Sequence, residues 1–433
     1  MSDVPGGPGS DDDEDPGRDP ARRPGDDPFS AMFSSMGTQD LGGLFQQLGR
    51  FLSYEGGPVN WDLARDMARQ TVVAQKDRSI TDGERAAVHD AVRLAELWLD
   101  DATTLPSTSA EAEAWSRAEW VEATLPVWRQ LCDPVASRVV SAMGEAVPAE
   151  MRQLGPLLGV MQQVGGAMFG AQVGQAIGEL SGEVVGSADV GVPLTATGRP
   201  ALMPAAVASF GEGLGIPADE VRLYLALREA AHQRLFTHVP WLRSHLLGTV
   251  EAYARGIRVD NSRIEEAMRD LDPSNPQVLQ EALTAGMFEP ETTPEQQVAL
   301  ARLETALALV EGWVDEVVDQ AATGHLPSAS ALRESVRRRR ATGGPAEQTF
   351  ATLVGLELRP RRMREGAALW AALLADRGVE GRDAVWAHPD LLPTSEDLDD
   401  PSAYVSRSGE LDLSGLDELP PTPDEDRPDD PQT

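Results

Sequence analysis

The chain has 433 residues and a formal net charge of −33, because 70 aspartates and glutamates outnumber 37 lysines and arginines. This excess of negative charge disfavours binding to a polyanion, so the sequence argues against nucleic acid or an anionic membrane face as a partner. The single cysteine, Cys132, excludes an intrachain disulfide and a cysteine-based zinc site and fits a reducing compartment. No positively charged segment followed by an apolar segment stands at the start, so the protein is expected to be cytoplasmic.

The two ends of the chain are rich in residues that bury little surface. Residues 1–27 are dominated by Gly, Pro and Asp, and residues 405–433 combine many acids with prolines. Neither composition can offset the entropy of ordering the backbone, so both tails are predicted to be disordered. One folded body is expected between them, over residues 28–404.

Two helix starts can be placed in the first part of this body. Asn60 stands immediately before a helical pattern and is a plausible N-cap. Thr81 and Glu84 have the spacing of a capping box before a strongly amphipathic stretch. We therefore expect one helix to begin after Asn60 and another after Thr81.

Residues 153–178 contain no charged side chain, and glycine recurs at every fourth position from 166 to 186. Each glycine inside a helix costs up to ~1 kcal/mol relative to alanine, so six cost roughly 5 kcal/mol, which packing must offset. A glycine face that lets a second helix approach closely would do so. A membrane span uses the same small-residue spacing, but five glutamines and Pro156 make this stretch weakly hydrophobic. We predict a buried helix and no stable membrane insertion.

The remaining chain is helical by pattern, with one exception. Residues 187–204 lose helical periodicity and contain turn-forming residues, so a short strand pair is expected there at most. The run Arg337–Arg340 is predicted to be a solvated helix end. The expected fold class is mainly α, a multi-helical single body.

Residues 217–256 form the most informative stretch, two predicted helices with one break. Pro217 suits the first turn of a helix. Pro240 disfavours the α conformation at Val239. The first helix is therefore expected to end near Phe236, and the second to begin at Pro240.

A charged group lies on an otherwise apolar stripe of the first of these helices. Arg228, Glu229 and His232 share this stripe at helical spacing. An unpaired buried charge costs several kcal/mol, so the three residues form either a mutually satisfied ionic cluster or part of a site. A glutamate three residues before a histidine is too common to choose between these interpretations.

The surrounding frame adds a second signal. Arg228-Glu229-Ala230-Ala231-His232 is the H-E-x-x-H zinc-protease frame with arginine at the first histidine. In that frame two imidazoles one turn apart hold zinc, and the glutamate acts on the bound water. His238 follows His232 by six residues, where the longer frame places its third ligand, although Leu235 replaces the expected glycine.

Several segments of the sequence resemble the zincin-like metallopeptidases of actinobacteria and some other bacteria. The segments are GGPVNWDLARDMARQ (56–70), VGVPL (190–194), REAAHQRLFTHVPWLRSHL (228–246), LVGLELRPRRMREGAALW (353–370) and RDAVWAHPDLLPTSEDL (382–398). The resemblance implies a mostly helical, zincin-like hydrolase with zinc as cofactor and a peptide or protein as substrate. It also implies Glu229 as general base and His232 as a zinc ligand.

The departure from this family pattern is Arg228, because a guanidinium stays protonated and cannot ligate a metal. In one outcome His232 holds the metal together with other residues, and the chain is a zinc-dependent hydrolase of the metallopeptidase type. In the other, the site is lost, Arg228 pairs with Glu229, and the chain is a catalytically inactive scaffold or protein-interaction module. The first is the working prediction. The further ligand candidates are His238, His245 and Glu251.

Overall fold

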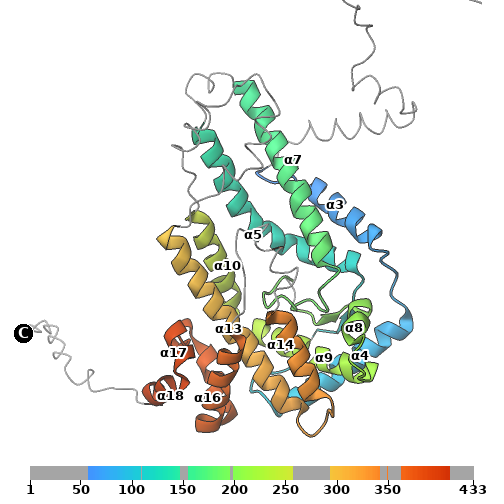
Figure 1. Cartoon of the computed structure of the whole chain (residues 1–433), viewed down its shortest axis with the longest axis vertical. Helices are drawn as coiled ribbons and strands as arrows, with labels where there is room; N and C mark the ends of the chain where they lie inside the picture. Colours follow the sequence, from blue (N-terminus) through green and yellow to red (C-terminus); the bar gives the residue numbers. More distant parts are fainter. Residues whose placement is uncertain are drawn as a thin grey trace, which may run out of the picture. The chain divides into compact units, whose positions relative to one another are not determined.

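The computed structural model describes residues 57–108, 110–146, 155–195, 198–256, 293–341, 349 and 362–409. All of them belong to the second of the two units into which the chain divides, residues 55–433. The described ranges are mainly helical (Figure 1), which confirms the prediction of a mainly α fold. The predicted tail 1–27 and the predicted boundary at residue 28 lie outside the described residues, as does the tail beyond Gly409.

The helices of the described chain are α3 (Trp61–Ala74), α4 (Asp82–Leu99), α5 (Arg117–Ala146), α7 (Gly155–Leu180), α8 (Pro204–Gly211), α9 (Ala218–His238), α10 (Pro240–Arg255), α13 (Pro294–Ala322), α14 (Ala329–Ala341), α16 (Met363–Asp383), α17 (Ser395–Asp399) and α18 (Pro401–Gly409). Two short 3-10 turns, η1 (Ala384–Ala387) and η2 (Pro389–Leu391), follow α16. The last helix therefore extends through the predicted start of the C-terminal tail.

The helix starts follow the capping signals in the sequence. The Asn60 side chain accepts a hydrogen bond from the Leu63 N–H at 3.0 Å. Thr81 and Glu84 form both bonds of a capping box at the start of α4. Both predicted starts are confirmed, because these bonds depend only on residues three apart in the sequence.

The break between α9 and α10 lies at Val239, whose backbone is extended away from the α region (φ −112°, ψ 78°). The prediction that α9 ends near Phe236 was wrong, because the helix continues to His238. Pro240 restricts only the residue immediately before it, so nothing prevents the helix from including the two residues ahead of Val239.

A minimal parallel sheet fixes the loop between α7 and α8. Strand β2 (Ala201–Leu202) lies in the stretch predicted to hold strands, and it pairs with β1 (Glu113–Ala114), which the sequence pattern did not indicate. Leu202 also bridges Gly186 in the antiparallel sense. Strands of two residues are too short for alternation to be visible in a sequence. Their effect is to hold Gly186 and residues 201–202 in place beside α9.

The glycine face of α7 packs against α3 at backbone distance (Figure 1). A Cβ atom at Gly174 would lie 2.1 Å from the Ala64 carbonyl oxygen, and one at Gly170 would lie 2.4 Å from that of Asn60. The prediction of a close helix crossing is therefore confirmed. In the part of the chain that the structure describes, no helix is long and apolar enough to cross a membrane.

Helix α13 is the buried centre of the second half, in contact with α9, α10 and α16. A Cβ atom at Gly312 would lie 2.5 Å from the backbone of Gly366, so α13 and α16 also cross closely. Trp370 stacks on Trp386 with ring centroids 5.2 Å apart, beside this crossing. These contacts fix the position of the residue next to Gly312, which is Glu311.

Substitution at Gly174 tests the α3–α7 crossing. Gly174→Leu is expected to lower the free energy of unfolding by more than about 3 kcal/mol, because even a Cβ atom overlaps the α3 backbone. Gly165→Leu is the matched control on the same helix, since a Cβ atom there meets nothing within 4 Å. It should be neutral or stabilising by up to about 1 kcal/mol. Urea unfolding followed by circular dichroism measures both, and equal effects would contradict the crossing.

Candidate functional site

The charged stripe predicted on α9 is buried. Arg228, Glu229 and His232 have exposed fractions of 5%, 3% and 2%. This face of α9 lies against α13, which carries Glu311, and against the loop after α7, which carries Ser187 and Ala188. Each polar group on the stripe must therefore find its partner inside the protein.

Glu229 is held by neutral hydrogen-bond donors. Its carboxylate accepts a short hydrogen bond from the Ser187 hydroxyl, one from the Ala188 N–H at 3.0 Å, and one from Gln233 Nε2 at 3.1 Å. The Ala201 N–H adds a longer contact at 3.3 Å. Burial raises the pKa of Glu229, and these hydrogen bonds offset only part of that effect.

The lost-site alternative expected Arg228 to pair with Glu229. The structure does not show this pairing. Arg228 Nη2 instead forms an ion pair with Glu311 Oε2 of α13 at 2.7 Å. The second oxygen of Glu311 contacts His232 Nε2 at 3.1 Å and Arg340 Nη2 of α14 at 3.0 Å. Burial alone would raise the pKa of Glu311, but these cations outweigh it and hold the pKa well below its usual range. Glu311 is thus the anion of a buried cluster.

The hydrogen bonds of His232 determine where its protons are. Nδ1 lies 2.8 Å from the Arg228 carbonyl oxygen, which can only accept, so Nδ1 carries a proton. Nε2 lies 3.1 Å from Oε1 of Glu311. Both ring nitrogens are therefore engaged within the protein, and neither is free to bind a metal.

Two glycines of the loop after α7 make room for the carboxylates. A Cβ atom at Gly186 would lie 2.6 Å from Glu229 Oε2. At Gly191, where φ is +78°, a Cβ atom would lie 2.8 Å from Glu311 Oε1. The loop backbone can therefore close over both acids only because these positions lack a side chain.

The arginine run of α14 takes part in this cluster. Arg340 contacts Glu311, and Arg337 pairs with the fully buried Asp315 at 2.6 Å. The prediction of a solvated helix end was wrong for these two residues. A charge run is recognised from composition alone, whereas its partners lie on another helix, α13.

The structure does not gather the predicted metal ligands around His232. His238 is exposed at the end of α9, and six residues along an unbroken helix place it about 240° around the axis from His232. His245, on α10, packs edge-to-face on Trp241 with ring centroids 5.8 Å apart. Glu251 is exposed. Among the residues that the structure describes, no three His, Cys, Asp or Glu side chains are placed to share a metal ion. The assignment of His232, His238 and His245 as ligands stays a prediction.

Sequence reasoning missed Glu311 and Arg340, although a signal for Glu311 existed. Glu311 and Asp315 stand one turn apart within ALVEGWVDEVV, the most apolar part of a predicted helix. Two acids at that spacing on a buried helix need cationic partners. In the structure the arginines of α14 supply part of them, a pairing that the sequence alone does not indicate.

The comparison with protein families matches residues 59–405 to the zincin-like metallopeptidases. The chain belongs to the zincin-like metallopeptidase family. A similar solved structure is that of a protein from Chloroflexus aurantiacus described as a "putative hydrolase with a novel fold", with a TM-score of 0.57, 20% identity, and coverage of 81% of this chain and 99% of that chain. At this identity the likeness shows a shared fold. The comparison with curated proteins gave no match.

Zincin-like peptidases are named for zinc, but the donor set at this motif does not fit that ion. The first ligand position holds the guanidinium of Arg228, and the imidazole of His232 and the carboxylate of Glu311 contact each other directly. Arg228 Nη1 is buried without a hydrogen-bond partner, which adds unscreened positive charge at this point. A second cation would be repelled there.

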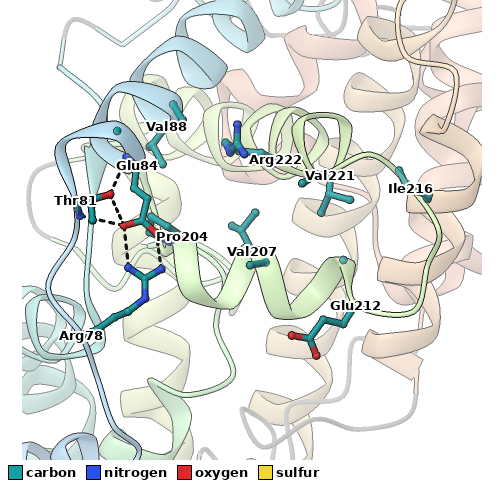
Figure 2. Close-up of a pocket in the computed structure, with 15 residues that line it drawn as sticks. Arg78, Thr81, Glu84, Val88, Pro204, Val207, Glu212, Ile216, Val221 and Arg222 are labelled. Carbon is teal, nitrogen blue, oxygen red and sulfur yellow. Dashed lines mark hydrogen bonds and ion pairs between the residues drawn. The ribbon is translucent and has the colours of Figure 1, made fainter.

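A cleft of this zincin-like fold lies apart from the motif, where α4, α8 and the start of α9 meet. Figure 2 shows Val207 of α8 pointing toward Val221 of α9, with Ile216 at one end and the bidentate Arg78–Glu84 pair at the other. The cleft has a volume of about 530 Å³. This size and its apolar floor suit a small ligand or the side chains of a partner.

Neutralising Glu311 tests the buried cluster. Glu311→Gln is expected to lower the free energy of unfolding at pH 7 by about 3–5 kcal/mol, because Arg228 loses its buried counter-ion. The folded-state pKa of Glu311 lies below the unfolded value of about 4.3, so its contribution is fully present above pH 4.3 and is lost as the pH falls below it. The difference between wild type and variant should therefore shrink below pH 4.3.

Urea unfolding at pH steps from 7 to 3 measures this difference. Glu229, whose pKa is shifted the opposite way, is present in both proteins, so its own pH dependence cancels. Glu334→Gln is the control, because its partners Arg338 and Arg364 are both mostly exposed. It should change stability by less than about 1 kcal/mol at any pH. A pH-independent difference for Glu311→Gln would argue against the cluster.

Proposed function

We propose that this chain is a non-catalytic member of the zincin-like family, a binding scaffold whose motif holds the fold together. The observation that carries the proposal is the contact set of Glu311. In zinc hydrolases of the two-histidine, one-carboxylate type, those three side chains hold the metal. Here Glu311 binds His232 directly and Arg228 takes the first ligand position, so the side chains of such a site neutralise one another.

A binding role is supported by the apolar cleft between α4, α8 and α9, which can take apolar side chains of a peptide or protein. We place this role in the cytoplasm, in keeping with the single unpaired cysteine, Cys132. The acidic composition of the chain argues against nucleic acid as the partner.

A second candidate is the zinc-dependent peptidase that the family name implies. It is favoured by Glu229 and His232, which occupy the base and ligand positions of the motif inside the matched region. In this candidate Glu229 is the general base, and His232 binds zinc together with His238 or His245. It requires the Glu311 contacts of His232 to open.

Metal content separates the two candidates. Wild-type protein purified without added zinc is expected to contain less than about a tenth of a zinc ion per chain, because the donors of the motif are paired with one another. Inductively coupled plasma mass spectrometry on dialysed protein measures this content. Stoichiometric zinc would overturn the proposal. A Glu229→Gln variant that kept that zinc but lost peptide hydrolysis would then establish the peptidase.

Rebuilding the motif tests the position assigned to Glu311. Arg228→His restores H-E-x-x-H beside a carboxylate already 3.1 Å from His232, so this variant should bind close to one zinc ion per chain. The double variant Arg228→His with Glu311→Gln should bind far less. Circular dichroism verifies that both are folded. A folded Arg228→His variant that binds no zinc would contradict the role given to Glu311.

A further inference from the structure

A small pocket with both polar and apolar walls lies one helical turn beyond the motif, at the C-terminal end of α9. Its volume is about 170 Å³. The lining residues are Pro193, Thr195 and Gly198 from the loop after α7, Gln233, Phe236 and Thr237 from α9, and Arg243 from α10. Gln233 separates this pocket from the buried cluster, because its amide nitrogen donates to Ser187 at 2.8 Å and to Glu229 at 3.1 Å.

Arg243 brings a positive charge to the pocket, and it has no acidic partner among the residues that the structure describes. Its Nη1 donates to the carbonyl oxygens of Pro193 and Thr195 at 3.0 and 2.8 Å, and both acceptors are neutral. Over the described ranges of the chain, no carboxylate lies within ion-pair distance of this guanidinium. Burial lowers the pKa of Arg243, and no neighbouring acid opposes that effect.

This lack of a partner is notable in a chain with 70 acidic and 37 basic side chains, where carboxylates are plentiful. The more deeply buried arginines of the molecule do have acidic partners. These pairs are Arg228 with Glu311, Arg234 with Glu96, Arg340 with Glu311, and Arg382 with Asp383. The charge of Arg243, uncompensated within the described part of the chain, therefore marks a place for an anion that these residues do not supply.

The groups around Arg243 can complete an anion site. The two carbonyl oxygens hold Nη1 in place, so the Nε and Nη2 donors of the guanidinium remain for a ligand. None of the three nitrogens is a buried donor that lacks a hydrogen-bond partner. The hydroxyls of Thr195 and Thr237 make no hydrogen bond within the described chain and are free to rotate toward a ligand. At Gly198, where φ is +60°, a Cβ atom would lie 2.8 Å from Thr237 Oγ1 and would fill the pocket wall.

We propose that this pocket, hereafter the Arg243 pocket, binds a carboxylate that carries a short apolar group. The free edge of the guanidinium matches a planar carboxylate, which it can bind through two parallel hydrogen bonds. Pro193 and Phe236 supply apolar walls for the substituent. A volume of about 170 Å³ corresponds to roughly five or six waters at about 30 Å³ each, which suits a short-chain acid or the last residue of a peptide. The proposal is independent of whether the motif binds zinc.

Propionate and propionamide are the probes, because they have nearly the same shape and differ in charge. Isothermal titration calorimetry at fixed ionic strength is expected to give saturable binding of propionate to the wild-type protein, and binding of propionamide at least ten-fold weaker. Arg243→Gln should weaken propionate binding at least ten-fold. Equal affinity for the acid and the amide, or no binding of propionate at all, would overturn the proposal.

Two further variants guard against an indirect effect of the arginine substitution, which also removes bonds to the loop. Thr237→Val leaves Arg243 untouched and should still weaken propionate binding several-fold. Arg117→Gln is the matched control, since Arg117 is also half-buried and donates to a backbone carbonyl at 3.0 Å, but lies outside the pocket. Its affinity should equal that of the wild type. Unchanged binding in both Arg243→Gln and Thr237→Val would refute the assignment.

The same titration distinguishes the two sources of such a carboxylate. N-acetyl-Ala-Ala and its C-terminal amide present the same side chains with and without the negative charge. If peptide termini are the ligand, the acid should bind at least ten-fold tighter than propionate, and the amide should lose that gain. If free short-chain acids are the ligand, propionate should bind at least as tightly as the peptide acid. Both results support a carboxylate site, and binding of the peptide amide as tight as the acid would count against it.

Discussion

One buried carboxylate, Glu311, determines how the second half of this protein is assembled. An ionised acid in the interior is costly unless several donors surround it. Glu311 is surrounded by Arg228 and His232 from α9 and by Arg340 from α14. Arg340 also contacts Asp189, so the loop after α7 is drawn into the same network. A single charge thus sets the relative positions of three helices and a loop that are far apart in the sequence.

Local features of the fold could be predicted from the sequence, because their causes are local. The caps at Asn60 and Thr81 depend on residues a few positions away, and the glycine face of α7 shows its spacing directly in the sequence. The partners of Arg228 and of the α14 arginines could not be predicted in this way. They depend on which helices meet in space. A single sequence shows that a buried charge needs a counter-ion, but it does not show which residue supplies it.

The candidate site shows the same division. The motif frame placed Glu229 and His232 together on one buried face, and the structure agrees. The frame also pointed to His238, which an unbroken α9 turns away from His232. Glu311 completes the cluster but belongs to no motif. The signal for it in the sequence is an acid within an apolar helix. Arg228 and Arg340, which both pair with Glu311, together carry two positive charges, the same formal charge as a zinc ion. The cluster can therefore preserve the electrostatic balance of a zincin centre with protein atoms alone.

The missing side chain at Gly186 has a consequence for which residues this position can accept. The space that its Cβ atom would fill is occupied by a carboxylate oxygen of Glu229. The Ala201 carbonyl oxygen lies 2.9 Å from the same point, so a shorter residue at the position of Glu229 would free only part of this space. Glycine at position 186 is therefore required on two counts, by the acid of α9 and by the backbone of β2, although the acid stands 43 residues away by number.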